Sequence, residues 1–297
     1  STLSSSSAAS DVYKRQVLDR IERLRNVMEQ QKIDCYIIPT DDYHYSEYVG
    51  DYFKFREYIT GFTGSAGTAV FTKDKAGLWT DGRYFIQAEA QLQGSGITLY
   101  KSGEPGVPMI EEFLKSELKE GDVLGFDGRT VTYAQGKRYC HIADENGASL
   151  QYRLDFAQNI WKERPEMSLE PVFSLADEYT GEKIGSKLER IREIMKENGC
   201  NAHVLSSLDD IAWLLNIRGN DIAYCPLVLS YAIVYNNSVE LFADIRKFSD
   251  DIVNSLAENQ VKIYPYEDIY HKVSEMTSED KVPVSYTHLR AHETRHD

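Results

Sequence analysis

Apolar residues recur at helical spacing at two places in the chain. The two runs are Val17, Ile21, Leu24 and Met28, and Ile184, Leu188, Ile191 and Met195. Spacings of three and four residues place such side chains on one face of a helix, so each run predicts an amphipathic helix. The second helix is expected to end near Gly199, because glycine is favoured just beyond a helix C-terminus.

The same order of elements follows each predicted helix. A short apolar strand comes first, at 35–38 and at 202–205, and leads into an Asp-Asp pair, 41–42 or 209–210, where an aspartate can cap the next helix. A glycine-rich loop, two strands, a helix, a strand and a final helix complete each copy. The five elements after the loop lie at 68–72, 77–80, 84–93, 97–100 and 108–118 in the first copy. In the second copy they lie at 227–235, 239–243, 247–258, 261–264 and 266–276.

This alternation of strands and helices predicts two similar layered α/β domains. The paired strands after each glycine-rich loop are close enough to form a hairpin, so we expect mixed sheets flanked by helices. Residues 164–185 have the composition of a linker, which predicts a first domain at 17–164 and a second at 165–283. The first copy continues with a strand at 123–126, whose counterpart begins only at 281–282, so the second domain is expected to be truncated.

The two ends of the chain do not fit this pattern. Ser6–Gln16 is the translation of a nucleotide string that resembles a transposase-based sequencing adapter, and Val284–Thr294 is the translation of its reverse-strand counterpart. We therefore interpret residues 1–16 and 284–297 as adapter-derived artefacts. We expect both segments to be disordered and leave them out of the predicted fold.

Composition and charge narrow the classes of function. The 297 residues are 42% hydrophobic with a net charge of −14, which suits two cores and argues against binding nucleic acid or anionic membranes. No apolar run approaches the roughly 20 residues of a membrane span. The four cysteines stand too far apart for a CxxC pair, and the serine-rich start lacks the apolar segment of a signal peptide. We expect a cytoplasmic protein.

Histidines occur at three places in the sequence where metal or acid–base chemistry is conceivable. His292, Glu293 and His296 fit the HExxH zinc pattern, but they lie in the adapter-like tail without an amphipathic helix or a third ligand, so no metal ligand is predicted. His44, near Glu47, lacks a further ligand and is expected at a surface or interface. His203 alternates within an apolar strand and is expected to be a satisfied core residue. No catalytic residue is predicted.

Two further motifs carry candidate binding chemistry. Gly61–Thr68, with the sequence GFTGSAGT, is either a cradle of backbone N–H groups for an anion or a tight turn between packed elements. Leu78–Phe85, with the sequence LWTDGRYF, places Arg83 on a bend between a strand and a helix. Arg83 is therefore either a ligand-binding guanidinium or a structural ion-pair partner, and Asp81 can also cap the next helix.

Several motifs together resemble one family. YIIPTDDYHYSEYVG, YITGFTGSAGTAVFT, LWTDGRYFIQAE, IWKERP and LDDIAWLLNIRGNDI, in this order, are similar to the cytoplasmic three-domain Xaa-Pro aminopeptidases. The resemblance covers nearly all of residues 17–283. It implies two creatinase-type N-terminal domains, with the family's pita-bread catalytic domain absent from this fragment.

The resemblance also implies a function for the parent protein. That family removes an N-terminal residue that precedes proline, using two divalent metal ions, usually manganese, to activate water. None of its metal ligands transfers to this sequence, so the fragment is expected to be inactive and without a cofactor. Arg83 matches the family's peptide-binding arginine and is the one substrate-binding residue predicted. Proline-containing peptides and a homodimer are implied for the full-length enzyme.

Two other interpretations stay open. The chain is alternatively a stand-alone peptide- or protein-binding module of the same fold, without chemistry. Another pita-bread enzyme, such as a prolidase or creatinase, is a third possibility, although two tandem N-terminal domains favour the aminopeptidase.

Overall fold

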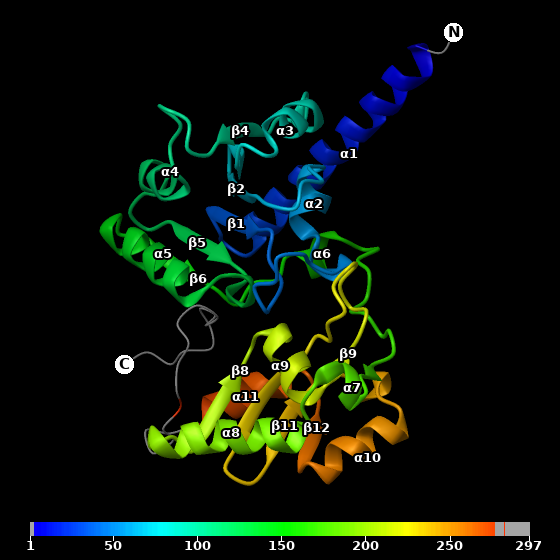
Figure 1. The fold of residues 1–297 in the computed structure, drawn as a ribbon. Coiled ribbons are helices and arrows are strands. Elements are labelled where there is room, and N and C mark those ends of the chain that lie inside the picture. The colour runs from blue at the N-terminus through cyan, green and yellow to red at the C-terminus, as the bar shows by residue number, and fades with distance from the viewer. Residues whose placement is uncertain (1–2, 277–281, 283–297) are drawn as a thin grey trace. The chain divides into compact units, whose positions relative to one another are not determined.

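The structure is a computed structural model that describes residues 3–276 and 282, and within them the chain forms two compact units (Figure 1). The first unit comprises residues 3–41 and 52–165. The second comprises residues 42–51, 166–276 and 282. A short 3-10 turn, η1 (Asp51–Phe53), lies where the chain returns to the first unit.

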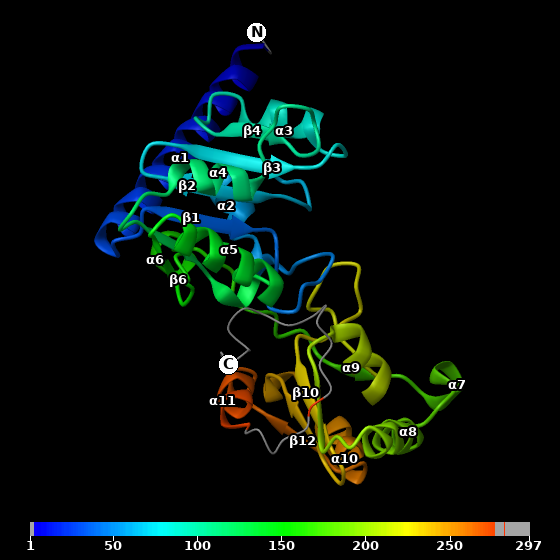
Figure 2. The ribbon, with the colours of Figure 1, turned by 90° about the vertical axis from the view of Figure 1, so that its left-hand side faces the viewer.

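A mixed six-stranded sheet forms the centre of the first unit. Its strands are β1 (Cys35–Pro39), β2 (Thr68–Thr72), β3 (Ala76–Thr80), β4 (Thr98–Lys101), β5 (Val123–Phe126) and β6 (Ser149–Gln151), in the order β4-β3-β2-β1-β5-β6. The pairs β1/β2 and β2/β3 are antiparallel, and the other three pairs are parallel. Figure 2 shows β3, β2 and β1 as neighbours. The predicted hairpin and mixed sheet are confirmed.

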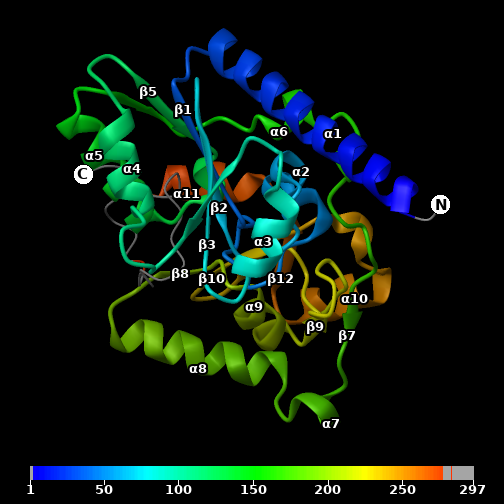
Figure 3. The same ribbon diagram turned by 90° about the horizontal axis from the view of Figure 1, so that it is seen from above.

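Helices cover both faces of this sheet (Figure 3). One face packs against α1 (Leu3–Gln30), α2 (Phe55–Thr60), α3 (Phe85–Leu92) and α6 (Ala157–Ile160), and the other against α4 (Ile110–Glu117) and α5 (Tyr133–Glu145). A 3-10 turn, η2 (Gly128–Thr130), precedes α5. The predicted layered α/β architecture is therefore confirmed for this unit.

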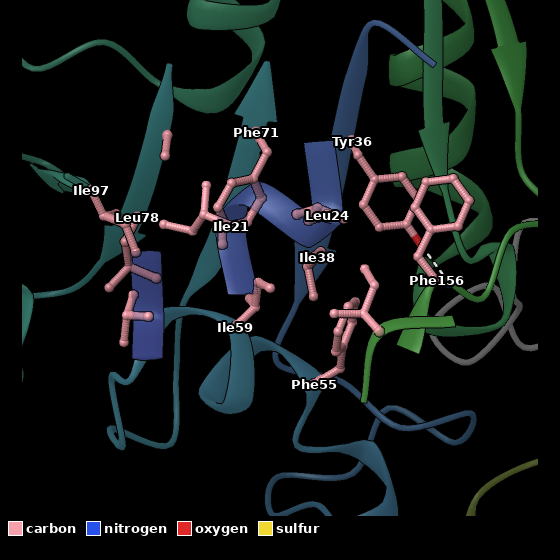
Figure 4. Packing of buried hydrophobic residues seen from close by; sticks show 14 of the residues in the cluster. Ile21, Leu24, Tyr36, Ile38, Phe55, Ile59, Phe71, Leu78, Ile97 and Phe156 are labelled. Carbon is pink, nitrogen blue, oxygen red and sulfur yellow. Dashed lines mark hydrogen bonds between the residues drawn. The ribbon is translucent and has the colours of Figure 1, made fainter. Parts of the chain in front are cut away.

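Strand β1 shows how the sequence builds a two-sided core. Its residues alternate, with Tyr36 and Ile38 on the α1 side and Cys35 and Ile37 on the α4 side, as expected for a strand buried on both faces. Tyr36 stacks on Phe156 with ring centroids 4.3 Å apart, and α1 adds apolar side chains to the same cluster (Figure 4).

The first helix begins earlier than its apolar pattern indicated. We expected the helix to open at Val17 and residues 1–16 to be disordered, but α1 starts at Leu3. The expectation of disorder is wrong for the backbone of residues 3–16. This segment contains neither proline nor glycine, so nothing in it stops a helix from extending toward the N-terminus.

The second unit repeats the core of the first. Its main sheet has the order β12-β11-β10-β8, built from β8 (Ala202–Leu205), β10 (Tyr231–Tyr235), β11 (Val239–Phe242) and β12 (Val261–Tyr264). The pairs β8/β10 and β10/β11 are antiparallel and β11/β12 is parallel, as in β1 to β4. The repeat predicted from the order of elements is confirmed.

Helices and short strands complete the second unit. They are β7 (Phe173–Ser174), α7 (Asp177–Thr180), α8 (Ile184–Glu197), α9 (Leu208–Leu215), β9 (Ile217–Arg218), η3 (Ile245–Lys247), α10 (Asp250–Glu258) and α11 (Asp268–Glu275). Strands β7 and β9 form a separate pair. Gly199 follows α8 with a φ of 68°, as predicted for a helix end. The strand expected at 281–282 falls outside the described residues, except Val282, which lies in no strand.

The Asp-Asp pairs do not cap helices as expected. Ser207 caps α9 by accepting a hydrogen bond of 3.4 Å from the Asp210 N–H, because it lies at the position that precedes the first helical residue. No helix follows Asp42 directly, and its carboxylate instead accepts hydrogen bonds from the N–H groups of His44 and Ser46 at 2.8 and 3.0 Å. The cap of α9 is thus Ser207 instead of an aspartate, whereas Asp42 accepts backbone N–H groups as expected but in a loop instead of at a helix start.

Candidate functional site

Arg83 lies on the turn that leaves β3 in the first unit. Asp81 Oδ1 accepts from the Arg83 backbone N–H at 3.0 Å and from Nε at 2.8 Å, while Oδ2 accepts from Nη2 at 2.8 Å. The side chains of Arg83 and Asp81 are 69% and 41% exposed. Asp81 therefore accepts hydrogen bonds from both the backbone and the guanidinium of Arg83, instead of capping α3 as one prediction proposed.

The glycine-rich loop is built around a buried arginine. Arg56, on α2, donates from its guanidinium to the carbonyl oxygens of Phe62 and Gly64 and, at 2.7 Å, to the hydroxyl of Thr40. The Gly67 carbonyl accepts from both the N–H and the hydroxyl of Thr40, at 2.9 and 2.8 Å. Burial lowers the pKa of Arg56 to about 10. The inward carbonyls favour the tight-turn interpretation of this loop over an anion cradle.

The structure brings the two sequence motifs together. The hydroxyls of Ser65, on the loop, and Tyr84, next to Arg83, share a hydrogen bond of 2.6 Å. The Tyr84 ring lies edge-on to Phe62, with centroids 5.9 Å apart. A Cβ at Gly64 would clash with Phe62 and approach the Tyr84 ring to 2.8 Å, so this position requires glycine. The loop therefore supports the residue beside Arg83.

The resulting site suits an anionic or carbonyl group of a ligand. Arg83 presents a planar fork of donors at the surface, and its Cζ lies 5.3 Å from the centre of the Tyr84 ring. Such a fork binds a carboxylate through parallel hydrogen bonds. The hydrogen bond from Arg83 lowers the pKa of Asp81, so this carboxylate is ionised at neutral pH and competes with a ligand for the guanidinium.

A second Asp-Gly-Arg turn in the same unit was missed in the sequence. Arg129 binds Asp127 through the same three contacts, at 3.0, 2.9 and 2.8 Å. Its side chain is only 22% exposed and also pairs with Asp155, which accepts from Arg164 at 2.8 Å. The feature of the sequence that indicates this second turn is the repeated tripeptide DGR, at 81–83 and 127–129.

The candidate histidines have roles other than those predicted. His44 is buried in the second unit, so of the two positions expected for it, a surface or an interface, the surface position is wrong. Its Nδ1 donates to the Ser206 carbonyl at 2.9 Å, and in the neutral ring Nε2 accepts from the Tyr266 hydroxyl at 2.7 Å. His203 was expected to be satisfied, but its buried Nδ1 has no hydrogen-bond partner among the described residues. Burial lowers the pKa of His203, which favours the neutral ring.

The described residues show no sign of a metal centre or a membrane span. Across residues 3–276 and 282, no three His, Cys, Asp or Glu side chains gather as metal ligands. The described residues therefore do not fit a dinuclear metal site. The HExxH pattern at 292–296 lies outside them. No helix in the described part of the chain is both long enough and apolar enough to span a bilayer.

Comparison with known proteins identifies the domains. Residues 20–151 and residues 163–294 each match a family described as the Creatinase/Prolidase N-terminal domain. The chain therefore belongs to the creatinase/prolidase N-terminal domain family and carries two copies of the domain in tandem.

The chain is homologous to the N-terminal part of Xaa-Pro aminopeptidase P. It is 39% identical over 277 residues to the probable Xaa-Pro aminopeptidase P of Sordaria macrospora, which covers 90% of this chain and 45% of the relative. Identity to Xaa-Pro aminopeptidase 1 of Dictyostelium discoideum is 37% over 260 residues, or 84% of this chain and 41% of that protein.

A solved structure has the same fold over both domains. It is the crystal structure of an X-prolyl aminopeptidase from Caenorhabditis elegans, described as a cytosolic enzyme with a di-nuclear active site. It is 34% identical, with a TM-score of 0.82 over 87% of this chain and 44% of that chain. The chain thus spans less than half the length of these relatives.

Proposed function

We propose that this chain forms the two non-catalytic N-terminal domains of an Xaa-Pro aminopeptidase, an enzyme that releases an N-terminal residue preceding proline. The observation that carries the proposal is the continuous homology to aminopeptidase P across both domains. The lack of a metal-ligand cluster among the described residues fits a non-catalytic part. We expect the parent enzyme to be a cytoplasmic homodimer that acts on proline-containing peptides.

Arg83 is the substrate-binding residue in this proposal. The exposed guanidinium and the support of its turn by Tyr84 and Ser65 favour ligand binding over a purely structural ion pair. A short peptide offers carbonyl oxygens and a C-terminal carboxylate, and an arginine fork binds either group through two hydrogen bonds. Asp81 keeps the fork oriented until the ligand arrives.

The metal chemistry belongs to another part of the parent enzyme in this proposal. Two divalent ions, manganese by resemblance to the family, would activate the attacking water there. The described residues bring no three potential metal ligands together, and in this proposal their contribution is confined to binding and orienting the peptide.

The coding DNA beyond Val282 tests this function. An in-frame domain with two aspartates, a histidine and two glutamates as metal ligands is expected, whereas a stop codon would favour the stand-alone binding module. The extended protein with manganese should release the first residue of an Xaa-Pro peptide. The 297-residue chain alone should not, and turnover by this chain that EDTA abolishes, in a preparation free of host peptidases, would contradict the proposal.

A further inference from the structure

The second unit contains a turn equivalent to the Arg83 turn. In the first hairpin the last paired residues are Thr68 and Trp79, and Asp81 lies two positions beyond Trp79. In the second hairpin the last pair is Tyr231 and Phe242, and Asp244 lies two positions beyond Phe242. Arginine follows each aspartate after one residue, at Arg83 and Arg246. The two arginines therefore occupy equivalent positions in the repeat.

The side-chain geometry of the two turns is also the same. Asp244 Oδ1 accepts from the Arg246 N–H at 3.0 Å and from Nε at 2.9 Å, and Oδ2 accepts from Nη2 at 2.5 Å. The Arg246 side chain is 69% exposed, the same fraction as for Arg83. Each aspartate thus presents the edge of a guanidinium at the protein surface in one orientation.

The residue after each arginine anchors its turn. Tyr84 anchors the first turn through its hydrogen bond to Ser65. In the second unit Lys247 is buried and forms an ion pair with buried Asp221, and its carbonyl accepts from the Val172 N–H at 2.8 Å. A turn that is anchored in this way restricts the motion of its exposed arginine, so less conformational entropy of the protein is lost when a ligand binds.

The surroundings of Arg246 indicate what kind of ligand fits. Ile245, the residue between Asp244 and Arg246, is 52% exposed, where the first turn has Gly82. The charge of Glu166 contributes to raising the pKa of Arg246, although the hydrogen bond and charge of Asp244 contribute more. An apolar side chain beside a guanidinium suits a ligand that combines a carboxylate with an aliphatic group.

We propose that Arg246 is a second carboxylate-binding position, which takes the C-terminal end of a short peptide whose last side chain contacts Ile245. The proposal extends the role proposed for Arg83 to its structural repeat, and so rests on that function. Arg129 has the same local contacts but is held by Asp155 and mostly buried, so it should not bind the peptide.

Titration of the chain with Gly-Pro-Leu, followed through the arginine Nε–Hε signals by NMR, tests this inference. Signals are assigned with the variants Arg83→Lys, Arg129→Lys and Arg246→Lys. The signals of Arg83 and Arg246 should shift and saturate, while that of Arg129 should stay in place. The C-terminal amide of the same peptide should bind Arg246 roughly tenfold more weakly, because it lacks the charged acceptor.

The possible outcomes separate the two proposals. A saturating shift at Arg83 without one at Arg246 overturns this inference and leaves the role of Arg83 intact. A shift at Arg246 alone supports a second site and contradicts the proposed role of Arg83. Equal shifts at all three arginines, or none, overturn both. Ile245→Ala should weaken binding at Arg246 but leave the Arg83 signal unchanged, and equal affinity in this variant would contradict the aliphatic contact.

Discussion

The first unit contains the tripeptide Asp-Gly-Arg twice, and the two copies differ in their surroundings. In both, the aspartate accepts from the backbone N–H and the side chain of the arginine two residues later. Arg83 is 69% exposed, whereas Arg129 is 22% exposed and joins Asp155 in a network. The local sequence therefore determines the shape of the turn, and the tertiary contacts separate a candidate binding residue from a structural one.

The network around Arg129 explains why that copy is structural. Asp155 accepts from both Arg129 and Arg164, and the guanidinium of Arg164 lies 3.7 Å from the centre of the Tyr52 ring. The partly buried Asp155 carboxylate, shared between Arg129 and Arg164, connects the turn after β5, the segment before α6 and the end of the first unit. The exposed ion pair between Arg83 and Asp81 contributes less to stability, because solvent screens it.

The largest expected effect comes from removing the buried copy. Arg129→Ala should lower the free energy of unfolding of the first unit by about 3 kcal/mol, because Asp127 loses its charged partner in a poorly solvated position and Asp155 keeps only Arg164. The matched change Arg83→Ala should alter it by no more than about 0.5 kcal/mol. Urea unfolding, followed by a probe in the first unit, measures both, and a larger loss for Arg83→Ala would reverse the assignment of roles.

A smaller effect tests how the glycine-rich loop supports the exposed copy. Gly64→Ala should lower the free energy of unfolding by about 1–3 kcal/mol, because the new Cβ would overlap Phe62 and press on Tyr84. Gly82→Ala is the control, since a Cβ there would meet only Phe85, at 3.8 Å. Thermal unfolding compares the two variants. Equal stability of the Gly64→Ala and Gly82→Ala variants would show that the loop rearranges at little cost in free energy and does not fix the position of Tyr84.

The smallest effect concerns the two aspartates. Arg83 lowers the pKa of Asp81, whereas burial raises the pKa of Asp127 against the opposing effect of Arg129. Asp81 should therefore add a little stability that is lost as pH falls below its ordinary pKa. Because of Asp127, the free energy of unfolding should fall as the pH rises from the ordinary pKa of an aspartate toward the raised pKa of this one. Carboxyl 13C NMR titration should give Asp81 the lower midpoint, which Arg83→Ala should raise, and the opposite order would contradict this electrostatic account.

The sequence predicted the repeated architecture well because it depends on local signals. Apolar spacing placed α8, and the short segments between strands indicated the β2–β3 and β10–β11 hairpins. Long-range packing could not be predicted in this way. Arg56 is a charged residue that the sequence gives no reason to bury, yet it is buried because loop carbonyls surround it. Residues 42–51 belong to the second unit because His44 and Tyr43 form hydrogen bonds there.

The candidate site was only partly predictable for the same reason. Arg83 stood out through its position after a strand and a glycine, but its partner Asp81 was interpreted as a helix cap. The contact between Ser65 and Tyr84 joins residues far apart in sequence, and neither residue carried a signal alone. Arg246 was overlooked because isoleucine replaces the glycine of the motif, so only the shared hairpin register revealed the equivalence.

The most direct test of the central claim is the effect of Arg83→Ala on peptide hydrolysis by the extended, active protein. The value of kcat/KM should fall about tenfold to a hundredfold, corresponding to roughly 1.4–3 kcal/mol for a charged hydrogen bond. Arg83→Lys should recover only part of this loss, because an ammonium group cannot reproduce the fork. Metal content and melting temperature should stay unchanged. Unchanged kinetics combined with a lower melting temperature would show that Arg83 is a structural partner of Asp81 and would contradict the account.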